Sequence, residues 1–307
     1  MDLASSSSAS PVAVTAGRLR LKPGLQSAPR WAAPRWPPTV SAGSWPDQVS
    51  ADWAYGGADG AGVRVCVLDT GVDGDHPIVG GVQAAMQVTA DAAGELRVVP
   101  GEATDLAGHG TACAGVIRTV APGCWLASVQ VLTKGTQGMG DVLLAGLRWA
   151  VDEGYDVINL SLSTTKLALR NELAGLCDSA YFRHCVVCAS AHNAPVLSFP
   201  WRFASVVSVA SITPPRADGA APVQHYYNPK PPVEFFAPGV GVRVAWRNGT
   251  MIKATGNSFA TPYIAGLCAL IMSKHPELTP FEVKTLLYHT AANVKRVAAV
   301  NGDDNDR

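Results

Sequence analysis

The feature that most constrains the fold is a series of short, continuously apolar runs rich in β-branched residues. Five of them follow one another along the chain, at 63–68, 126–132, 157–162, 185–190 and 206–210. A strand with one solvated face alternates apolar and polar residues, whereas a strand buried on both faces is apolar throughout. Helical patterns such as 141–153 and 259–274 lie between or after these runs. The sequence therefore predicts an α/β fold in three layers, with a mostly parallel central sheet flanked by helices.

Composition bounds the size of the domain and the class of partner. The chain has 307 residues, of which 48% are hydrophobic and 16% charged, and its formal net charge is zero. This suits one large buried core. It argues against nucleic acid or an anionic membrane surface as the main partner, because either favours a strong basic excess. No apolar run approaches the roughly 20 residues of a membrane-spanning helix.

Two polar segments flank the predicted domain. Residues 1–45 are rich in Ser, Ala and Pro, and no acidic residue occurs between Asp2 and Asp47. Such a segment buries too little apolar surface to offset the entropy lost on ordering, so we expect it to be disordered. We expect the folded domain to span 46–295 and residues 296–307 to form a polar C-terminal tail.

The N-terminal sequence and the cysteines bear on the compartment. No basic start followed by an apolar stretch is present, so the N-terminus does not match a secretory signal. The seven cysteines are odd in number and irregularly spaced, which fits reduced, buried thiols better than a disulfide framework. Both features indicate a cytoplasmic protein. An organellar transit peptide, which is also Ser-rich and poor in acid, is the minor alternative.

Polar residues that could take part in catalysis occur where the predicted strands end and the predicted helices begin. Active sites of parallel α/β folds gather beyond the carboxyl ends of the strands. Asp69 ends the first apolar run and Asn193 closes the fourth. His109 lies between two glycines, which suits a helix that starts in a tight contact. Ser258 precedes an apolar helix, with Pro262 in the predicted first turn, where free N–H groups favour negative charge.

Each of these residues also has an ordinary structural interpretation. An aspartate or asparagine after a strand is often a turn residue, a lone histidine is more often structural, and a serine at a helix start is a common N-cap. Asp69-Thr70-Gly71 also matches the aspartic-protease signature. That class needs two such carboxylates, and the chain has one such tripeptide, so a homodimer would be required. Only the combination of all four residues points to chemistry.

In the order Asp69, His109, Asn193 and Ser258, these segments resemble the signature blocks of the subtilases, the superfamily of subtilisin and proteinase K. Further segments follow the family pattern at the expected spacing, namely 131–140, 145–150, 157–162 and 236–240. The similarity covers roughly residues 46–295. Several blocks in register are far more specific than any one of them alone.

The resemblance implies a serine endopeptidase with Asp69, His109 and Ser258 as its catalytic triad. Ser258 would attack the peptide carbonyl while His109 takes the proton and returns it to the leaving amine. Asp69 would orient His109. Asn193 and the Ser258 N–H would bind the oxyanion of this acyl transfer. No cofactor is required by this chemistry, and no ligand set for a structural calcium can be matched to the sequence.

The resemblance also implies that a peptide or protein substrate binds as an added β-strand. The expected substrate-binding residues belong to two extended segments and a neighbouring loop: Gly138, Met139, Gly140, Ser161, Leu162, Ser163, Ala191 and His192. Ser163, His192 and Ser198 stand where the family usually has glycine. They favour a narrow or polar pocket that takes small or acidic side chains, unless His192 turns outward and the pocket stays broad.

Other residues depart from the family or suggest other chemistry. Asn257 replaces the usual threonine before the nucleophile, which removes a hydroxyl and predicts somewhat weaker catalysis. Cys113, one helical turn after His109, resembles a free thiol near the catalytic histidine of proteinase K-like enzymes. Cys185 and Cys188 form a C-x-x-C, but on a strand they point to opposite faces, so we expect no metal site.

Two functions of other kinds share the same scaffold. A non-catalytic peptide-binding module could use a groove whose catalysis was lost, although such a module has no need of all four intact residues. A peptide ligase or macrocyclase would resolve the acyl-enzyme with an amine in place of water. Sequence alone does not separate ligation from hydrolysis.

Overall fold

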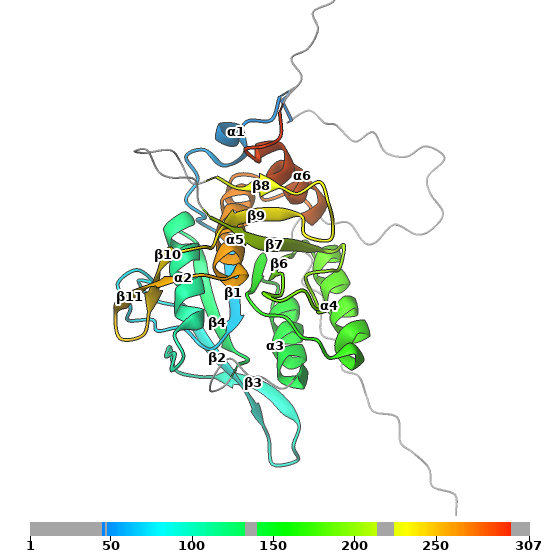
Figure 1. The fold of residues 1–307 in the computed structure, drawn as a ribbon. Coiled ribbons are helices and arrows are strands. Elements are labelled where there is room, and N and C mark those ends of the chain that lie inside the picture. The colour runs from blue at the N-terminus through cyan, green and yellow to red at the C-terminus, as the bar shows by residue number, and fades with distance from the viewer. Residues whose placement is uncertain (1–44, 47, 133–139, 214–223, 296–307) are drawn as a thin grey trace, which may run out of the picture. The chain divides into compact units, whose positions relative to one another are not determined.

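The computed structural model describes residues 45–46, 48–132, 140–213 and 224–295, which Figure 1 shows as a ribbon. The strands are β1 Arg64–Asp69, β2 Ala84–Ala90, β3 Leu96–Pro100, β4 Trp125–Gln130, β5 Val157–Leu160, β6 Val186–Ser190, β7 Val206–Ile212, β8 Tyr226–Tyr227, β9 Phe235–Pro238, β10 Val242–Trp246 and β11 Thr250–Ala254. The helices are α1 Ala51–Tyr55, α2 His109–Val120, α3 Gly140–Asp152, α4 Arg170–Phe182, α5 Asn257–Lys274 and α6 Pro280–Thr290, with a 3₁₀ turn at Leu167–Leu169.

Nine strands form one twisted sheet in the order β3-β2-β4-β1-β5-β6-β7-β9-β8. All neighbouring pairs are parallel except the two at the edges, β2–β3 and β8–β9. The five apolar runs of the sequence correspond to β1, β4, β5, β6 and β7 at the centre of this sheet. The predicted α/β fold with a mostly parallel sheet is confirmed. A separate two-stranded hairpin, β10–β11, packs on α2.

Helices cover both faces of the sheet because each central strand is apolar on both sides. In β1, Val65 and Val67 belong to the core that includes α2 and α5, and Cys66 and Leu68 belong to the core that includes α3 and α4. Figure 1 shows α3 and α4 together on one side and α2 and α5 on the other. The chain therefore has the three predicted layers.

The two cysteines of the C-x-x-C sequence follow the same alternation. Cys188 packs in the core on the side of α5, where its Sγ lies 3.8 Å from that of Cys268. Cys185 packs in the opposite core with α3 and α4. The two thiols face opposite sides of the sheet, as predicted, so they do not share one metal ion.

Both ends of the predicted domain can be compared with the described residues. Trp45 packs against the core, with its ring centroid 5.6 Å from that of Trp53. The rest of the predicted disordered segment 1–45 and the predicted tail 296–307 lie outside the described residues. None of the helices in the described ranges is long and apolar enough to cross a membrane.

Helix α5 is apolar around its whole circumference, which is typical of a buried helix. It packs against α2, α6 and the sheet. It approaches α2 closely at Gly266, where an added Cβ would lie 2.7 Å from Cβ of Val120. Gly175 in α4 is also helical, but an added Cβ there would meet no atom within 4 Å. The two glycines therefore differ in packing and share the same helical propensity cost.

We expect Gly266→Ala to lower the free energy of unfolding by roughly 1–2 kcal/mol, because the overpacking of Val120 outweighs the gain in helix propensity. The matched variant Gly175→Ala should raise it by about 0.5–1 kcal/mol, since it gains propensity without a clash. Urea unfolding of the two variants and the wild type measures both changes. Equal effects at the two positions would contradict the close α2–α5 contact.

Candidate active site

Asp69 ends β1 and is completely buried. The alternation of the strand turns its side chain to the same face as Val65 and Val67, which is the face covered by α2 and α5. Its Oδ1 accepts a hydrogen bond from the Thr70 N–H at 2.8 Å and lies 2.7 Å from His109 Nδ1. The carboxylate and the imidazole, predicted from separate parts of the sequence, are thus in direct contact.

His109 is the first residue of α2, and the glycines on either side of it allow the helix to begin there. Gly108 is the N-cap in a left-handed conformation with φ 92°, and a Cβ on it would lie 2.7 Å from the Trp246 ring. A Cβ on Gly110 would overlap the carbonyl oxygen of Gly71. The start of α2 therefore fits between the loop after β1 and the β10–β11 hairpin only without side chains at these positions.

Asp105 holds the loop before α2, a role that the sequence analysis missed. Its Oδ1 accepts from Thr70 Oγ1 at 2.9 Å, Ala107 N–H at 3.0 Å and Gly108 N–H at 2.8 Å. Its Oδ2 accepts from the N–H and Oγ1 of Thr111 at 2.9 and 2.8 Å. An aspartate side chain in a turn often accepts the N–H two residues further on, as Asp105 does from Ala107, so the sequence held a usable signal.

The two carboxylates control the protonation of His109, whose side chain is 16% exposed. Burial lowers the pKa of His109. The charge and hydrogen bond of Asp69, together with the charge of Asp105, outweigh that effect and leave the pKa above its ordinary value. When Nδ1–H donates to Asp69, the neutral ring keeps Nε2 as its proton acceptor. His109 is thus suited to take up a proton on its Nε2 edge.

The start of α5 differs from the predicted one. Gly256 is the N-cap and Asn257 the first helical residue, so Ser258 is the second residue and Pro262 lies inside the helix, beyond the first turn. Pro262 has no N–H for the Ser258 carbonyl four residues earlier. Ser161 Oγ donates to this carbonyl at 2.8 Å in its place, and the Cys113 thiol lies 3.6 Å away.

Asn193 lies beside the start of α5 and is exposed. Its Oδ1 accepts the Asn257 N–H at 3.0 Å, which identifies the oxygen end of the amide. The Nδ2 end faces Gly256, since a Cβ on Gly256 would lie 3.7 Å from Nδ2. The N–H of Ser258, in the first turn of the helix, has no acceptor within α5. Asn193 Nδ2 and the Ser258 N–H are therefore two hydrogen-bond donors at the start of α5.

A cavity of about 430 Å³ opens between these elements. It is lined by most of the residues that the sequence predicts for the site: His109, Asn193, Ser258, Ser161, Leu162, Ser163, Ala191 and His192. Asp69 lies behind His109. The structure thus brings His109, Asn193 and Ser258 into one cleft with the predicted substrate segments that follow β5 and β6.

The predicted substrate segment before α3 is only partly described. Gly138 and Met139 lie outside the described residues. Gly140 is the first residue of α3, and a Cβ on it would overlap the Leu169 side chain. The prediction of an extended edge is therefore wrong at Gly140, because the apolar helical repeat and the acidic first turn at Asp141 extend the helix back to this glycine.

The sequence and the fold of this chain are similar to those of known proteins. The sequence profile of the Subtilase family matches residues 60–305, which is most of the chain. Subtilisin DY of Bacillus licheniformis is 31% identical over 270 residues, which cover 81% of this chain and 89% of the relative. The chain belongs to the subtilase family. It is a subtilisin-like serine protease.

Two further comparisons agree with this assignment. Subtilisin BL of Lederbergia lenta is 32% identical over 251 residues, which cover 78% of this subtilase and 86% of the relative. The crystal structure of a cold-adapted subtilisin-like serine proteinase superposes with a TM-score of 0.59 at 28% identity, covering 75% of this chain and 82% of the other. The aspartic-protease interpretation of Asp69-Thr70-Gly71 is thereby wrong.

The three residues predicted to stand at glycine positions of the family lie in two different environments. Ser163 and His192 line the cleft. His192 Nδ1 accepts the Ala194 N–H at 3.0 Å, which holds the ring at the cleft. Ser198 is fully buried and accepts a 2.8 Å hydrogen bond from Nε1 of the buried Trp201. Two of the three residues therefore line the cleft, and the third is a buried hydrogen-bond partner of the Trp201 indole.

Asp69, His109 and Cys113 place their ligand atoms within 4.8 Å of one another. Cys113 Sγ lies 3.8 Å from Asp69 Oδ2. Burial, and then the charge of Asp69, raises the pKa of the Cys113 thiol well above its usual range. Thiolates and not thiols bind metals, so these residues fit a hydrogen-bonded network better than a metal centre. Absence of a catalytic metal stays a prediction.

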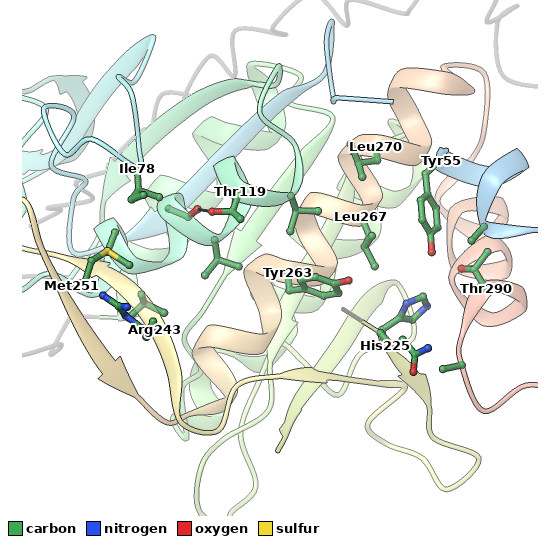
Figure 2. Close-up of a pocket in the computed structure, with 18 residues that line it drawn as sticks. Tyr55, Ile78, Thr119, His225, Arg243, Met251, Tyr263, Leu267, Leu270 and Thr290 are labelled. Carbon is green, nitrogen blue, oxygen red and sulfur yellow. Dashed lines mark hydrogen bonds between the residues drawn. The ribbon is translucent and has the colours of Figure 1, made fainter. Parts of the chain in front are cut away.

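A larger cavity, of about 750 Å³, is lined by residues of α2, α5 and the β10–β11 hairpin, and by residues at the end of α6 and just after it (Figure 2). Its wall is mostly apolar, with Arg243 and Met251 towards one end and His225 and Thr290 towards the other. Burial lowers the pKa of His225. None of the predicted site residues lines this cavity. The predicted site residues therefore converge on the smaller cavity and not on this one.

We expect Asp105→Asn to lower the pKa of His109, because the substitution removes a negative charge that stabilises the imidazolium and weakens the loop that positions the ring. An NMR titration of the His109 ring in both proteins measures the shift. Asp91→Asn, in the turn between β2 and β3, is the control and should leave the His109 pKa unchanged. An unchanged pKa in Asp105→Asn would contradict the coupling.

Proposed function

We propose that this subtilase hydrolyses peptide bonds through an acyl-enzyme, with Ser258 as nucleophile, His109 as general base and Asp69 as the carboxylate that orients the base. The observation that carries the proposal is the 2.7 Å contact between His109 Nδ1 and the buried Asp69 Oδ1, at the edge of a cleft that Ser258 also lines. A buried carboxylate paired with an imidazole that is 16% exposed, beside a serine at a helix start, is the arrangement that activates a weak hydroxyl nucleophile.

The proposed steps use groups of this chain alone. His109 Nε2 takes the Ser258 hydroxyl proton as Oγ attacks the carbonyl carbon, and then gives it to the leaving amine. Ser258 Oγ and His109 Nε2 are not hydrogen-bonded to each other in the structure, and such bonds often tighten only when substrate binds. Asn193 Nδ2 and the Ser258 N–H donate to the oxyanion. Water then resolves the acyl-enzyme, and no cofactor takes part.

The proposed substrate is a peptide or protein segment bound in extended form beside residues 161–163, in the manner of an added strand. We propose that the pocket for the residue before the cleaved bond accepts small or acidic side chains. Support comes from Ser163 and His192, which line the cleft. Large aromatic side chains would need these groups to move.

We also propose that the protease works in a reducing compartment such as the cytoplasm. The seven cysteines are all buried and are spread over both cores. This distribution suits thiols used as small apolar side chains.

Treatment with a fluorophosphonate followed by intact-protein mass spectrometry tests the nucleophile. We expect one adduct on the wild type, none on Ser258→Ala and much slower labelling of His109→Ala, because the hydroxyl needs the base. Peptidase activity of Ser258→Ala should fall on the order of 10⁶-fold. A well-folded wild type that takes no adduct would favour a peptide-binding module. Product masses in the presence of an added amine separate hydrolysis from ligation.

Cleavage of a peptide library that varies the residue before the scissile bond tests the pocket. We expect alanine, serine, aspartate and glutamate to be preferred over phenylalanine and tyrosine by at least about tenfold, since one or two kcal/mol of clash suffices. His192→Gly should narrow this preference by opening the pocket. A profile dominated by large aromatic residues in the wild type would overturn the narrow pocket and leave the proposed chemistry standing.

A further inference from the structure

We propose that Asn257, the residue before the proposed nucleophile, is a positioning residue that holds Asn193 against the start of α5. The inference rests on the proposed function, since it concerns the placement of the proposed oxyanion donor. Asn257 touches neither substrate nor proton in this proposal. It acts through the loop that carries Asn193.

Four hydrogen bonds use the full capacity of the Asn257 side chain. Its Oδ1 accepts from the N–H and the Oγ of Ser211, at 2.8 and 2.9 Å. Its Nδ2 donates to the carbonyl oxygens of Ala191 and His192, at 3.1 and 3.3 Å. One amide therefore joins three elements: the first turn of α5, the end of β7 and the loop that leaves β6.

The contact with Asn193 is reciprocal. The Asn257 main-chain N–H donates to Asn193 Oδ1 at 3.0 Å, while the Asn257 side chain holds the two carbonyls that come just before Asn193 in the chain. Asn193 is exposed, so packing alone does not fix its side chain. The clamp therefore sets both the backbone position of Asn193 and the direction of its amide, with Nδ2 towards Gly256.

A threonine cannot make this set of contacts. Its hydroxyl has one proton to donate, whereas two carbonyl oxygens and two Ser211 donors surround the Asn257 amide. Asn257 lacks the hydroxyl of a threonine, but its amide fixes the loop that carries Asn193 in a different way. Weaker catalysis does not follow from the missing hydroxyl.

The test variant is Asn257→Asp, which keeps the shape and the acceptor for Ser211 and turns a carboxylate oxygen towards the carbonyls of Ala191 and His192. We expect kcat for a tetrapeptide p-nitroanilide with alanine before the cleaved bond to fall on the order of 10–10²-fold. That is less than the 10²–10³-fold expected from removing an oxyanion donor itself. KM should change by less than about threefold, because substrate contacts are kept.

Asn228→Asp is the matched control. The Asn228 amide also donates to two carbonyls, those of Lys230 and Val233, at 2.8 and 3.0 Å, but it lies in the loop between β8 and β9. This variant should lose stability in thermal unfolding without a loss of kcat. If Asn257→Asp does not fold, Asn257→Ser, which removes the amide without adding charge, takes its place and should lower kcat in the same way.

A double-mutant cycle with Asn193→Ala separates positioning from general damage. If Asn257 acts through Asn193, Asn257→Asp should lower kcat little further in the Asn193→Ala background. Unchanged kcat in the single variant, or an equal loss in both backgrounds, would overturn the role of Asn257. Ser258→Ala in the same assay keeps the two proposals apart, since full activity of that variant would refute the proposed nucleophile instead.

Discussion

The contact between Asp69 and His109 is the interaction on which the arrangement of the site depends. A carboxylate is buried at the end of a central strand only if hydrogen bonds replace the lost water. The Thr70 N–H and the imidazole supply them. The imidazole reaches that position because α2 starts between Gly108 and Gly110, where any side chain would collide with the hairpin or the loop after β1. Strand alternation and the two missing side chains together place the His109 imidazole at the carboxyl end of a central strand.

The serine is placed by a second constraint, which is the proline inside α5. Pro262 leaves the Ser258 carbonyl without its helical donor, and the hydroxyl of Ser161 satisfies it. Ser161 begins the segment that is expected to bind substrate, so the hydrogen bond that replaces the missing helical one joins Ser258 to that segment. The same carbonyl also approaches Cys113 on α2. The Ser258 carbonyl thereby connects α5 to α2, which carries His109, and to the segment that begins at Ser161. Rigid elements position reacting groups better than loops do.

The sequence predicts the centre of the fold better than its edges. The central strands were found within about two residues because burial on both faces leaves a continuous apolar run. Strands β2 and β3 are half-buried and give no such run. Asp69, His109, Asn193 and Ser258 could be singled out because local rules place each at the end of a strand or the start of a helix. The role of Asp105 was missed because its donors come from separate segments that meet only on folding. The position of Pro262 inside α5 was not predicted for a similar reason, because the donor that replaces its missing N–H, Ser161 Oγ, comes from another segment.

The departures from the family pattern support one another. The His192 ring is held by the Ala194 N–H, and the His192 carbonyl is held by Asn257. The side chain that lines the pocket and the peptide that precedes Asn193 therefore belong to a loop fixed from both sides. The buried Ser198 hydroxyl accepts a hydrogen bond from the Trp201 indole, which a glycine at this position could not do. The hydrogen bonds of Asn257 to this loop also hold Asn193, whose Nδ2 faces Gly256. The proposed pocket and the proposed oxyanion donor thus belong to one hydrogen-bonded loop, so a substitution at His192 acts on the residues that position Asn193 as well.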